Sequence, residues 1–396
     1  MGDPAELTAS AETSIADIGR EAWDACANPP SASRDRKWRY PFLSFDFLEA
    51  LERSGCASAK TGWLGQHLVL RTASGEIVAV CPCYLKNHSF GEYVFDHAWA
   101  DAFERAGGRY YPKLQAAVPF TPVTSPRILV RDGFERPVAE RALASAAIQI
   151  TGRLDASSLH LTFLPEDEWT HLGALGLLQR TGKQFRWPNR GYGTFDDFLS
   201  ALSSRKRKTI RKERARALES GIEVELVTGA DLAERHWDAF FDFYMDTGAR
   251  KWGHPYLNRA FFSLISERMA GQLLLVLARR AGRYIAGALN IIGADTLFGR
   301  YWGAIEYHEC LHFELCFYQA IDFAIAEGIQ WVEAGAGGQH KLARGYLPMT
   351  TYSAHYVAHK GLRRAIADYL DDERNWVELE QRELGEHAPY RHGDGG

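Results

Sequence analysis

The stretch that decides the fold covers residues 273–333 and opens with the letters LLLVLARRAGRYIAGALNIIGADTLFGRYWGA. Its first half holds three apolar runs separated by short turns that contain glycine, which predicts an antiparallel meander of three strands. Apolar residues at helical spacing then predict a helix, and a short strand follows it. The predicted elements are strands over 273–279, 284–292 and 296–303, a helix over 311–327 and a strand over 330–333.

Similar patterns extend to both sides of this stretch. Residues 188–193, PNRGYG, are rich in turn formers and predict a boundary between two domains, 1–190 and 191–396. Thr194 is a good N-cap for a helix that we expect over 195–220. Further predicted elements are helices over 42–54, 136–150 and 362–384 and strands over 64–71, 77–85, 158–163, 177–187 and 351–358.

Composition limits the class of protein. The 396 residues are 46% hydrophobic, 24% charged and 12% aromatic, which excludes a disordered or fibrous chain. The formal net charge is -4, so binding to nucleic acid would need a local basic patch. Six cysteines include no C-x-x-C pair, and no apolar run approaches 18 residues. We expect a cytoplasmic protein with reduced thiols, and peripheral contact with a membrane stays open.

Residues 205–216, RKRKTIRKERAR, form the densest charge cluster, because eight of these twelve residues are basic. On a helix, like charges one turn apart such as Lys208 and Lys212 repel each other. A phosphate-rich ligand would offset that repulsion: coenzyme A, a nucleic acid or an anionic lipid. The alternative is a solvated helix paired with acidic groups elsewhere. Lys206, Lys208 and Arg211 are therefore candidate donor-binding residues.

Residues 333–341, EAGAGGQHK, form a second candidate site at the end of a predicted strand. Glycines 335, 337 and 338 allow a ligand to approach the backbone closely. Lys341 and Arg344 are near enough in sequence to neutralise an anion, and His340 is a candidate base. The alternative is a flexible surface turn. We assign Gly335, Gly337, Gly338, Lys341 and Arg344 to donor binding.

Residues 308–312, HECLH, match the H-E-x-x-H pattern of zinc hydrolases. Zinc binding requires both histidines on one helix, whereas the apolar periodicity begins only near Leu311. We therefore expect no metal at His308 and His312, although a zinc hydrolase remains a third functional hypothesis. Glu314, with Tyr318 one turn further on, is a candidate general base, and His312 is a candidate catalytic residue beside it.

Residues 84–96, YLKNHSFGEYVFD, interleave aromatic residues with ionisable ones, and YYPK at 110–113 continues the pattern. Such a segment suits a cleft for a peptide or a sugar, although aromatic segments are more often core.

These segments together resemble the bacterial FemAB-like family of N-acyltransferases, a peptidoglycan-related group of the GNAT superfamily. The resemblance covers about residues 40–360 and rests on KNHSFGEY (86–93), YYPK (110–113), SRKRKTIR (204–211), RKWG (250–253), GRYWG (299–303), LHFE (311–314) and GAGGQHK (335–341). It implies an α+β (mixed α/β) fold of two tandem GNAT-like modules, each a mostly antiparallel sheet flanked by helices. The order of meander, helix and two strands is that of a GNAT core.

The resemblance also extends the set of candidate residues. Arg300 and Tyr301 join the donor-binding set, and the acceptor-binding set is Lys86, His88, Glu92, Tyr93, Lys113 and Trp252. One departure matters. GNAT proteins hold the pyrophosphate of coenzyme A on a glycine-patterned loop at a helix N-terminus. Residues 303–309, GAIEYHE, lack that pattern and carry two acids. Fem aminoacyltransferases also lack the loop and use aminoacyl-tRNA.

The sequence thus predicts an acyltransferase that moves an acyl or aminoacyl group onto an amine without a covalent enzyme intermediate. The donor is a coenzyme A thioester or an aminoacyl-tRNA, with no tightly bound cofactor. The acceptor is a small molecule, a peptide or a cell-wall precursor. The alternative is a non-catalytic double-GNAT protein that binds nucleic acid or an envelope precursor.

Overall fold

The computed structural model describes residues 7–34, 37–251 and 255–391, and the chain divides into two compact units. The first unit comprises Met1–Ser33, Phe42–Lys183 and Thr350–Leu379, and the second comprises Arg34–Pro41, Gln184–Met349 and Glu380–Gly396. The predicted domains 1–190 and 191–396 differ from this division, because a late segment of the chain returns to the first unit. The turn formers at 188–193 follow the end of a strand and do not mark the boundary between the units.

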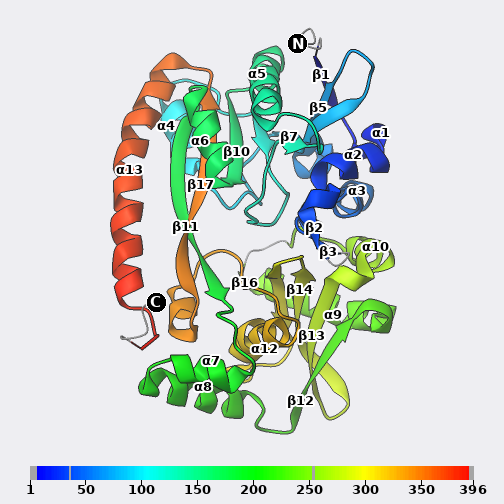
Figure 1. Cartoon of the computed structure of the whole chain (residues 1–396), viewed down its shortest axis with the longest axis vertical. Coiled ribbons are helices and arrows are strands. Elements are labelled where there is room, and N and C mark those ends of the chain that lie inside the picture. The colour runs from blue at the N-terminus through cyan, green and yellow to red at the C-terminus, as the bar shows by residue number, and fades with distance from the viewer. Residues whose placement is uncertain (1–6, 35–36, 252–254, 392–396) are drawn as a thin grey trace. The chain divides into compact units, whose positions relative to one another are not determined.

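The first unit mixes short strands with helices (Figure 1). Its helices are α1 (Ile15–Ile18), α2 (Arg20–Ala27), α3 (Phe45–Arg53), α4 (His97–Arg105), α5 (Arg136–Arg153), α6 (Glu166–Ala174) and most of α13 (Lys360–Glu386). Its strands are β1 (Thr8–Glu12), β4 (Trp63–Gly65), β5 (His67–Arg71), β6 (Ile77–Cys81), β7 (Cys83–Lys86), β8 (Lys113–Ala116), β9 (Leu129–Val130) and β10 (Ser158–Leu164), with parts of β11 (Leu178–Pro188) and β17 (Leu347–Val357).

Two sheets organise these strands. One has the order β1-β5-β6-β9 and is antiparallel throughout. The other includes β17-β10-β8-β7-β4, in which only the β10–β8 pairing is parallel. The predicted strands 64–71 and 77–85 are each divided into two, because the chain passes from one sheet to the other at Gln66 and again at Pro82. Pro82 has no N–H to donate to a sheet. Helix α5 packs on β5, β6 and β10 over an apolar core.

The second unit is built on the predicted meander. Its strands are β12 (Ile222–Thr228), β13 (Leu273–Arg280), β14 (Arg283–Ile292), β15 (Thr296–Ala304) and β16 (Trp331–Glu333), in the order β12-β13-β14-β15-β16-β11. All these pairings are antiparallel except β15 with β16. The antiparallel meander is therefore confirmed. A short ribbon of β2 (Ser33–Arg34) and β3 (Lys37–Trp38) lies nearer the N-terminus in sequence.

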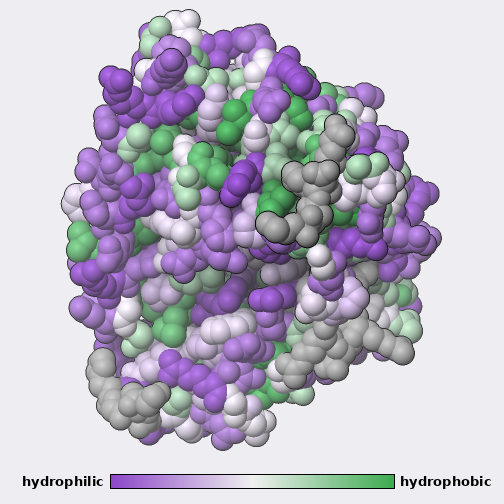
Figure 2. Space-filling model, turned by 45° about the horizontal axis from the view of Figure 1, so that its top comes forward, coloured by the Kyte–Doolittle hydropathy of each residue, from purple (hydrophilic) through white to green (hydrophobic). Residues whose placement is uncertain are grey.

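Helices of the second unit pack around this sheet. They are α7 (Phe195–Ala201), α8 (Ser204–Ala217), α9 (Glu234–Lys251), α10 (Arg259–Met269), α11 (Leu311–Phe313) and α12 (Gln319–Ala326). The single helix that we predicted over 195–220 is wrong, because the chain leaves helical geometry at Leu202 (ψ 158°) and starts again after Ser203. Thr194 caps α7 as expected, since its hydroxyl accepts the N–H of Asp197. The face of the molecule in Figure 2 is mostly hydrophilic, with small separate hydrophobic patches.

Candidate active site

The candidate active site lies in the second unit where β15 and β16 part. These parallel strands pair only over Thr296–Phe298 and Trp331–Glu333. Strand β16 then ends, whereas β15 continues to Ala304 along β14. Beyond Glu333 the chain passes through three glycines with φ of 70°, 72° and 89°, a conformation that side chains disfavour. The predicted donor-binding and catalytic residues of the second half of the chain cluster around this parting, so it is the candidate for the site of catalysis.

Charged side chains meet at the ends of these two strands. Glu333 is buried and accepts hydrogen bonds from Arg186 (2.6 Å) and Arg300 (3.3 Å). Lys341 is also buried, and its ammonium donates to the carbonyl oxygens of Gly335 (2.7 Å) and Ala336 (3.3 Å). Burial and the nearby Arg300 guanidinium lower the pKa of Lys341 to about 8. Lys341 thus holds the glycine loop and adds positive charge beside Arg300.

An imidazole pair lies on the neighbouring surface. The rings of His312 and His340 are 6.4 Å apart, and the ring of Phe317 lies within 6 Å of both. His340 is exposed, and burial of its inner side, together with Arg344 and Lys341, lowers its pKa. The imidazole is therefore neutral at pH 7 and can accept a proton. The structure brings these two predicted catalytic histidines together.

Glu314 has a different environment. Its carboxylate is fully buried, and Arg214 donates to both oxygens at 2.9 and 3.2 Å. The amide of Gln319 donates to the same carboxylate at 2.7 Å. Burial raises the pKa of Glu314, although Arg214 opposes this effect. Residues Glu314–Tyr318 form a π-helical turn, an irregularity frequent at functional sites.

A second, half-buried carboxylate joins α8 to the segment after the glycine loop. The carboxylate of Glu213 accepts two hydrogen bonds from Arg344, at 2.8 and 2.9 Å, and one from the hydroxyl of Tyr318. The guanidinium of Arg344 also lies 3.3 Å from the ring centroid of Phe313. We did not predict Glu213 as a site residue. The sequence feature that could have identified it is that Glu213 is the one acid within the basic run 205–216.

The remaining basic residues of α8 divide into two groups. Arg211 pairs with Asp196, and Arg216 pairs with Glu219 and Glu309. Among the described residues, five other cations of α8 have no carboxylate within salt-bridge distance: Arg205, Lys206, Arg207, Lys208 and Lys212. Four of the five stand in the first turn and a half of the helix, where the helix dipole disfavours positive charge. This end of α8 is suited to binding an anion.

The H-E-x-x-H residues do not share a helix. His308 lies in the turn before α11, and its carbonyl accepts the N–H of Leu311. The imidazole of His308 contacts Glu306, which also binds Arg280, whereas His312 packs on Trp302. Within the described ranges no group of His, Cys, Asp or Glu has the arrangement of a metal site.

Four of the predicted acceptor-binding residues gather in the first unit. Lys86 and Lys113 are fully buried, and Lys113 donates to Glu92 (2.7 Å). Lys86 lies 3.9 Å from Glu92 and 3.3 Å from Nδ1 of His88. Burial lowers the pKa of Lys86 to about 7 and raises that of Glu92 to about 7. These lysines stabilise the segment around them and present no charge to solvent.

The other predicted residues are placed as follows. Tyr93 has a positive φ of 61° in the same segment as Glu92. The ring of Tyr301 on β15 packs on Tyr244, with centroids 5.5 Å apart. Trp252 lies outside the described residues.

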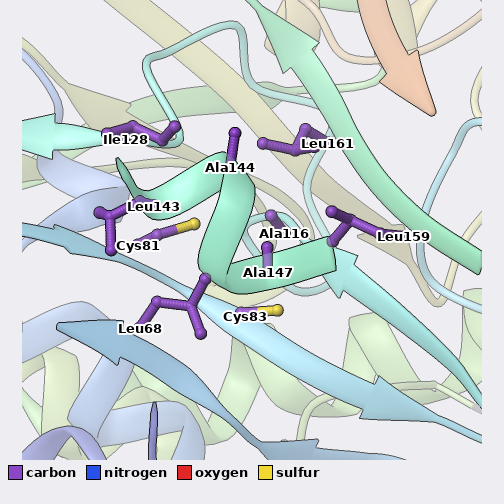
Figure 3. A pocket seen from close by; sticks show the side chains of 10 residues that line it. All are labelled: Leu68, Cys81, Cys83, Ala116, Ile128, Leu143, Ala144, Ala147, Leu159 and Leu161. Carbon is purple, nitrogen blue, oxygen red and sulfur yellow. The ribbon is translucent and has the colours of Figure 1, made fainter. Parts of the chain in front are cut away.

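A small apolar cavity in the first unit is unrelated to these groups (Figure 3). Side chains from α5 face residues of β5, β6, β7, β8 and β10 around it, including Cys81 and Cys83. Burial raises the pKa of Cys83 to about 12, so the thiol is uncharged. The cavity has no charged group and is a gap in the core.

Comparison with known proteins identifies the family. Residues 14–392 match the FemAB-like family, which is described by peptidoglycan biosynthesis and recognition. The chain belongs to the FemAB-like family. No curated protein matches the sequence. Among solved structures, FemX is 14% identical with a TM-score of 0.53, covering 91% of this chain and 100% of FemX.

Two further structures have the same fold. L-PGS from Bacillus licheniformis is 10% identical with a TM-score of 0.50, covering 85% of this chain and 95% of that one. The C-terminal domain of a putative lysylphosphatidylglycerol synthetase from Agrobacterium fabrum is 12% identical with a TM-score of 0.51, covering 81% and 95%. The predicted fold class of mixed α and β is confirmed, and its division into two tandem GNAT-like modules stays a prediction.

Family and fold together connect this FemAB-like chain with peptidoglycan biosynthesis or recognition. In the part of the chain that the structure describes, no helix has both the length and the apolar character to span a bilayer.

Proposed function

We propose that this FemAB-like protein transfers an aminoacyl group from aminoacyl-tRNA to the amine of a peptidoglycan precursor. The observation that carries the proposal is the row of five cations without ion pairs on α8, named above. A helix whose first turn is basic is destabilised by its own dipole unless an anion binds there. The phosphates of a tRNA backbone supply such charge over a wide surface.

The connection between β15 and α11 argues against coenzyme A. It contains two acids, Glu306 and Glu309, and both form ion pairs. Helix α11 is only three residues long before the π-helical turn, and Cys310 before it has a positive φ of 66°. A pyrophosphate needs free N–H groups at the start of a regular helix and is repelled by carboxylates. The Fem aminoacyltransferases, which the sequence resembles, take their donor from tRNA.

The reaction is a direct acyl transfer. The acceptor amine attacks the ester carbonyl carbon of the aminoacyl-tRNA, a C–N bond forms, and the ester C–O bond breaks to release the tRNA hydroxyl. We assign His340 as the group that takes the amine proton and passes it to the leaving tRNA oxygen, because it is exposed and neutral at pH 7. Glu314, the other candidate base, is engaged by Arg214 and acts in positioning the π-helical turn.

Lys341 and Arg300 stabilise the negative charge that develops on the carbonyl oxygen, since both lie beside the parting of β15 and β16. Charged tRNA is cytoplasmic, so we place the reaction in the cytoplasm.

The proposal is tested with charge reversals on α8. We expect the double variant Lys208→Glu/Lys212→Glu to bind charged tRNA about tenfold or more weakly. The slope of log affinity against log salt concentration should become less steep by about one unit for each phosphate no longer bound. The matched control is Arg283→Glu, an exposed cation at the first residue of β14, which should bind as the unaltered protein does. Equal binding by the double variant, or transfer of an acyl group from a coenzyme A thioester, would overturn the tRNA proposal.

A further inference from the structure

The loop between β7 and α4 in the first unit presents aromatic rings to solvent. Phe90 and Phe95 are 60% and 69% exposed, although apolar rings of this size normally gain free energy by burial. His97, also exposed, lies between them, with ring centroids 6.2 Å from Phe90 and 6.3 Å from Phe95. We call these three residues the aromatic platform.

The buried lysines hold this loop from beneath. The ammonium of Lys86 donates to the carbonyl of Phe90 at 3.3 Å. That of Lys113 donates to Ser89 (2.7 Å) and to Asp96, residues near either end of the loop. A fully buried lysine costs free energy unless its donors are satisfied. Two such residues under one irregular loop indicate that its conformation is specified.

Other contacts fix the two phenylalanines individually. Gly91 has a φ of 81°, and a Cβ there would come within 2.7 Å of the Phe120 ring, so only glycine fits. The carbonyl of Phe95 accepts a hydrogen bond from Arg180 at 2.8 Å, and Glu373 holds Arg180 through two further bonds of 2.7 Å. The backbone that carries the exposed rings is therefore pre-organised, which lowers the entropic cost of binding.

The surface of the loop carries little charge. Its two acids, Glu92 and Asp96, are buried, and the neutral side chain of Asn87 is exposed. Burial and the Lys86 ammonium lower the pKa of His88, so this imidazole is neutral at pH 7. Exposed ring faces beside neutral hydrogen-bonding groups suit a neutral ligand that has both C–H faces and hydroxyl groups.

We propose that the aromatic platform binds a saccharide ring, of the neutral N-acetylated amino-sugar kind, as a subsite for the glycan part of the acceptor. The C–H face of the sugar stacks on Phe90 and Phe95, and its hydroxyl and amide groups bond to Asn87 and His97. The link to the acceptor rests on the proposed function, whereas sugar binding itself does not.

The test is a titration of the full chain, without any donor, with a neutral trisaccharide of N-acetylglucosamine, followed by NMR or calorimetry. We expect Phe90→Ala and Phe95→Ala each to weaken binding about tenfold, and Phe90→Trp, which keeps an aromatic face, to restore it. The matched control is Tyr307→Ala in the second unit, which removes an exposed aromatic ring (89%) and should bind normally.

Absence of binding to the unaltered chain, or equal binding by both alanine variants, would overturn the proposal. So would binding of the platform to lipid vesicles in place of the sugar. Because no donor is present, failure of tRNA-dependent transfer leaves this result unaffected. A further result would support the two proposals separately. The Phe90→Ala variant would no longer bind the sugar, and it would still transfer to a sugar-free peptide amine at the unaltered rate.

Discussion

The imidazole of His340 combines exposure to solvent with a lowered pKa, caused first by burial of its inner side and then by Arg344 and Lys341. If it takes the amine proton, His340→Ala lowers kcat by about 10²–10⁴-fold with little change in KM. Activity of the unaltered enzyme falls as pH drops through the pKa of the folded state, which lies below the ordinary 6.5. Steady-state rates from pH 5 to 8 measure both effects. A His340→Ala enzyme that keeps the rate and the acid limb would contradict the assignment.

Glu314 is a positioning residue, which holds the π-helical turn through its pairing with Arg214. Glu314→Gln removes the negative charge that pairs with Arg214, and we expect a loss of about 1–3 kcal/mol in the free energy of unfolding. The loss stays below that for a fully orphaned buried charge because Asp322 also binds Arg214, at 2.7 Å. Urea denaturation measures it, and kcat per folded molecule should change less than tenfold. The matched control is Glu309→Gln at an exposed pair with Arg216, which should cost under about 1 kcal/mol.

Sequence identified the residue types at the site but not their burial. Glycine, histidine and lysine after a strand pointed to residues 335–341, and the structure places His312 near His340 as well. The pairing of Arg214 with Glu314 joins positions 100 residues apart, and no local spacing carries that information. For the same reason, Lys86 and Lys113 looked like ligand contacts when they are the buried support of a loop.

Individual elements were predictable where one pattern continued without interruption. The meander strands agree with the structure within one residue at most ends, because each is an apolar run between glycine turns. The breaks were less predictable: the π-helical turn at Glu314–Tyr318 interrupts a helix whose apolar spacing stays helical. Likewise α7 and α8 separate at Leu202 and Ser203, where no proline or glycine marks the break in the sequence.

Helix α8 gives a test that separates ligand binding from a solvated surface. Arg205 stands exposed in its first turn, so Arg205→Glu replaces an unfavourable charge by one that the helix dipole favours. We expect the free energy of unfolding to rise by about 0.3–1 kcal/mol while affinity for charged tRNA falls. Lys212→Glu, further from the N-terminus of α8, should weaken binding without that gain in stability. Stabilisation with unchanged tRNA affinity would favour the solvated helix.

At the scale of the whole molecule, the order of segments along the chain does not show which segments form each unit. Patterns within the sequence predicted the strand over 351–358 and the final helix, but not that Thr350–Leu379 belongs with the first unit. Strand β17 pairs antiparallel with β10, with Ser158 opposite Val357, and such non-local pairing leaves no periodic signal. A boundary placed at the turn formers 188–193 therefore gave two continuous domains.

This discontinuity predicts how truncated chains behave. A chain that ends at Met349 lacks β17's pairing with β10, the buried residues Ile366 and Leu370 of α13, and the His355 partner of His160 (2.7 Å). Strand β10 would keep β8 on one side and become an edge strand on the other, so its outward N–H groups would lose their partners. We expect rapid proteolysis and a loss of amide protection in β10 of this chain.

The matched control is a chain that ends at Leu379, which keeps all of the first unit and removes only the segment assigned to the second. Its β10 amides should stay protected. Its second unit should instead become less stable, because the hydrogen bond from the hydroxyl of Tyr390 to the carbonyl of Gly345 (2.7 Å) disappears. Hydrogen exchange followed by mass spectrometry resolves the two units in both chains. Equal protection of β10 in the chain that ends at Met349 would mean that the first unit folds from residues 1–183 alone, and would restore the simple division near residue 190.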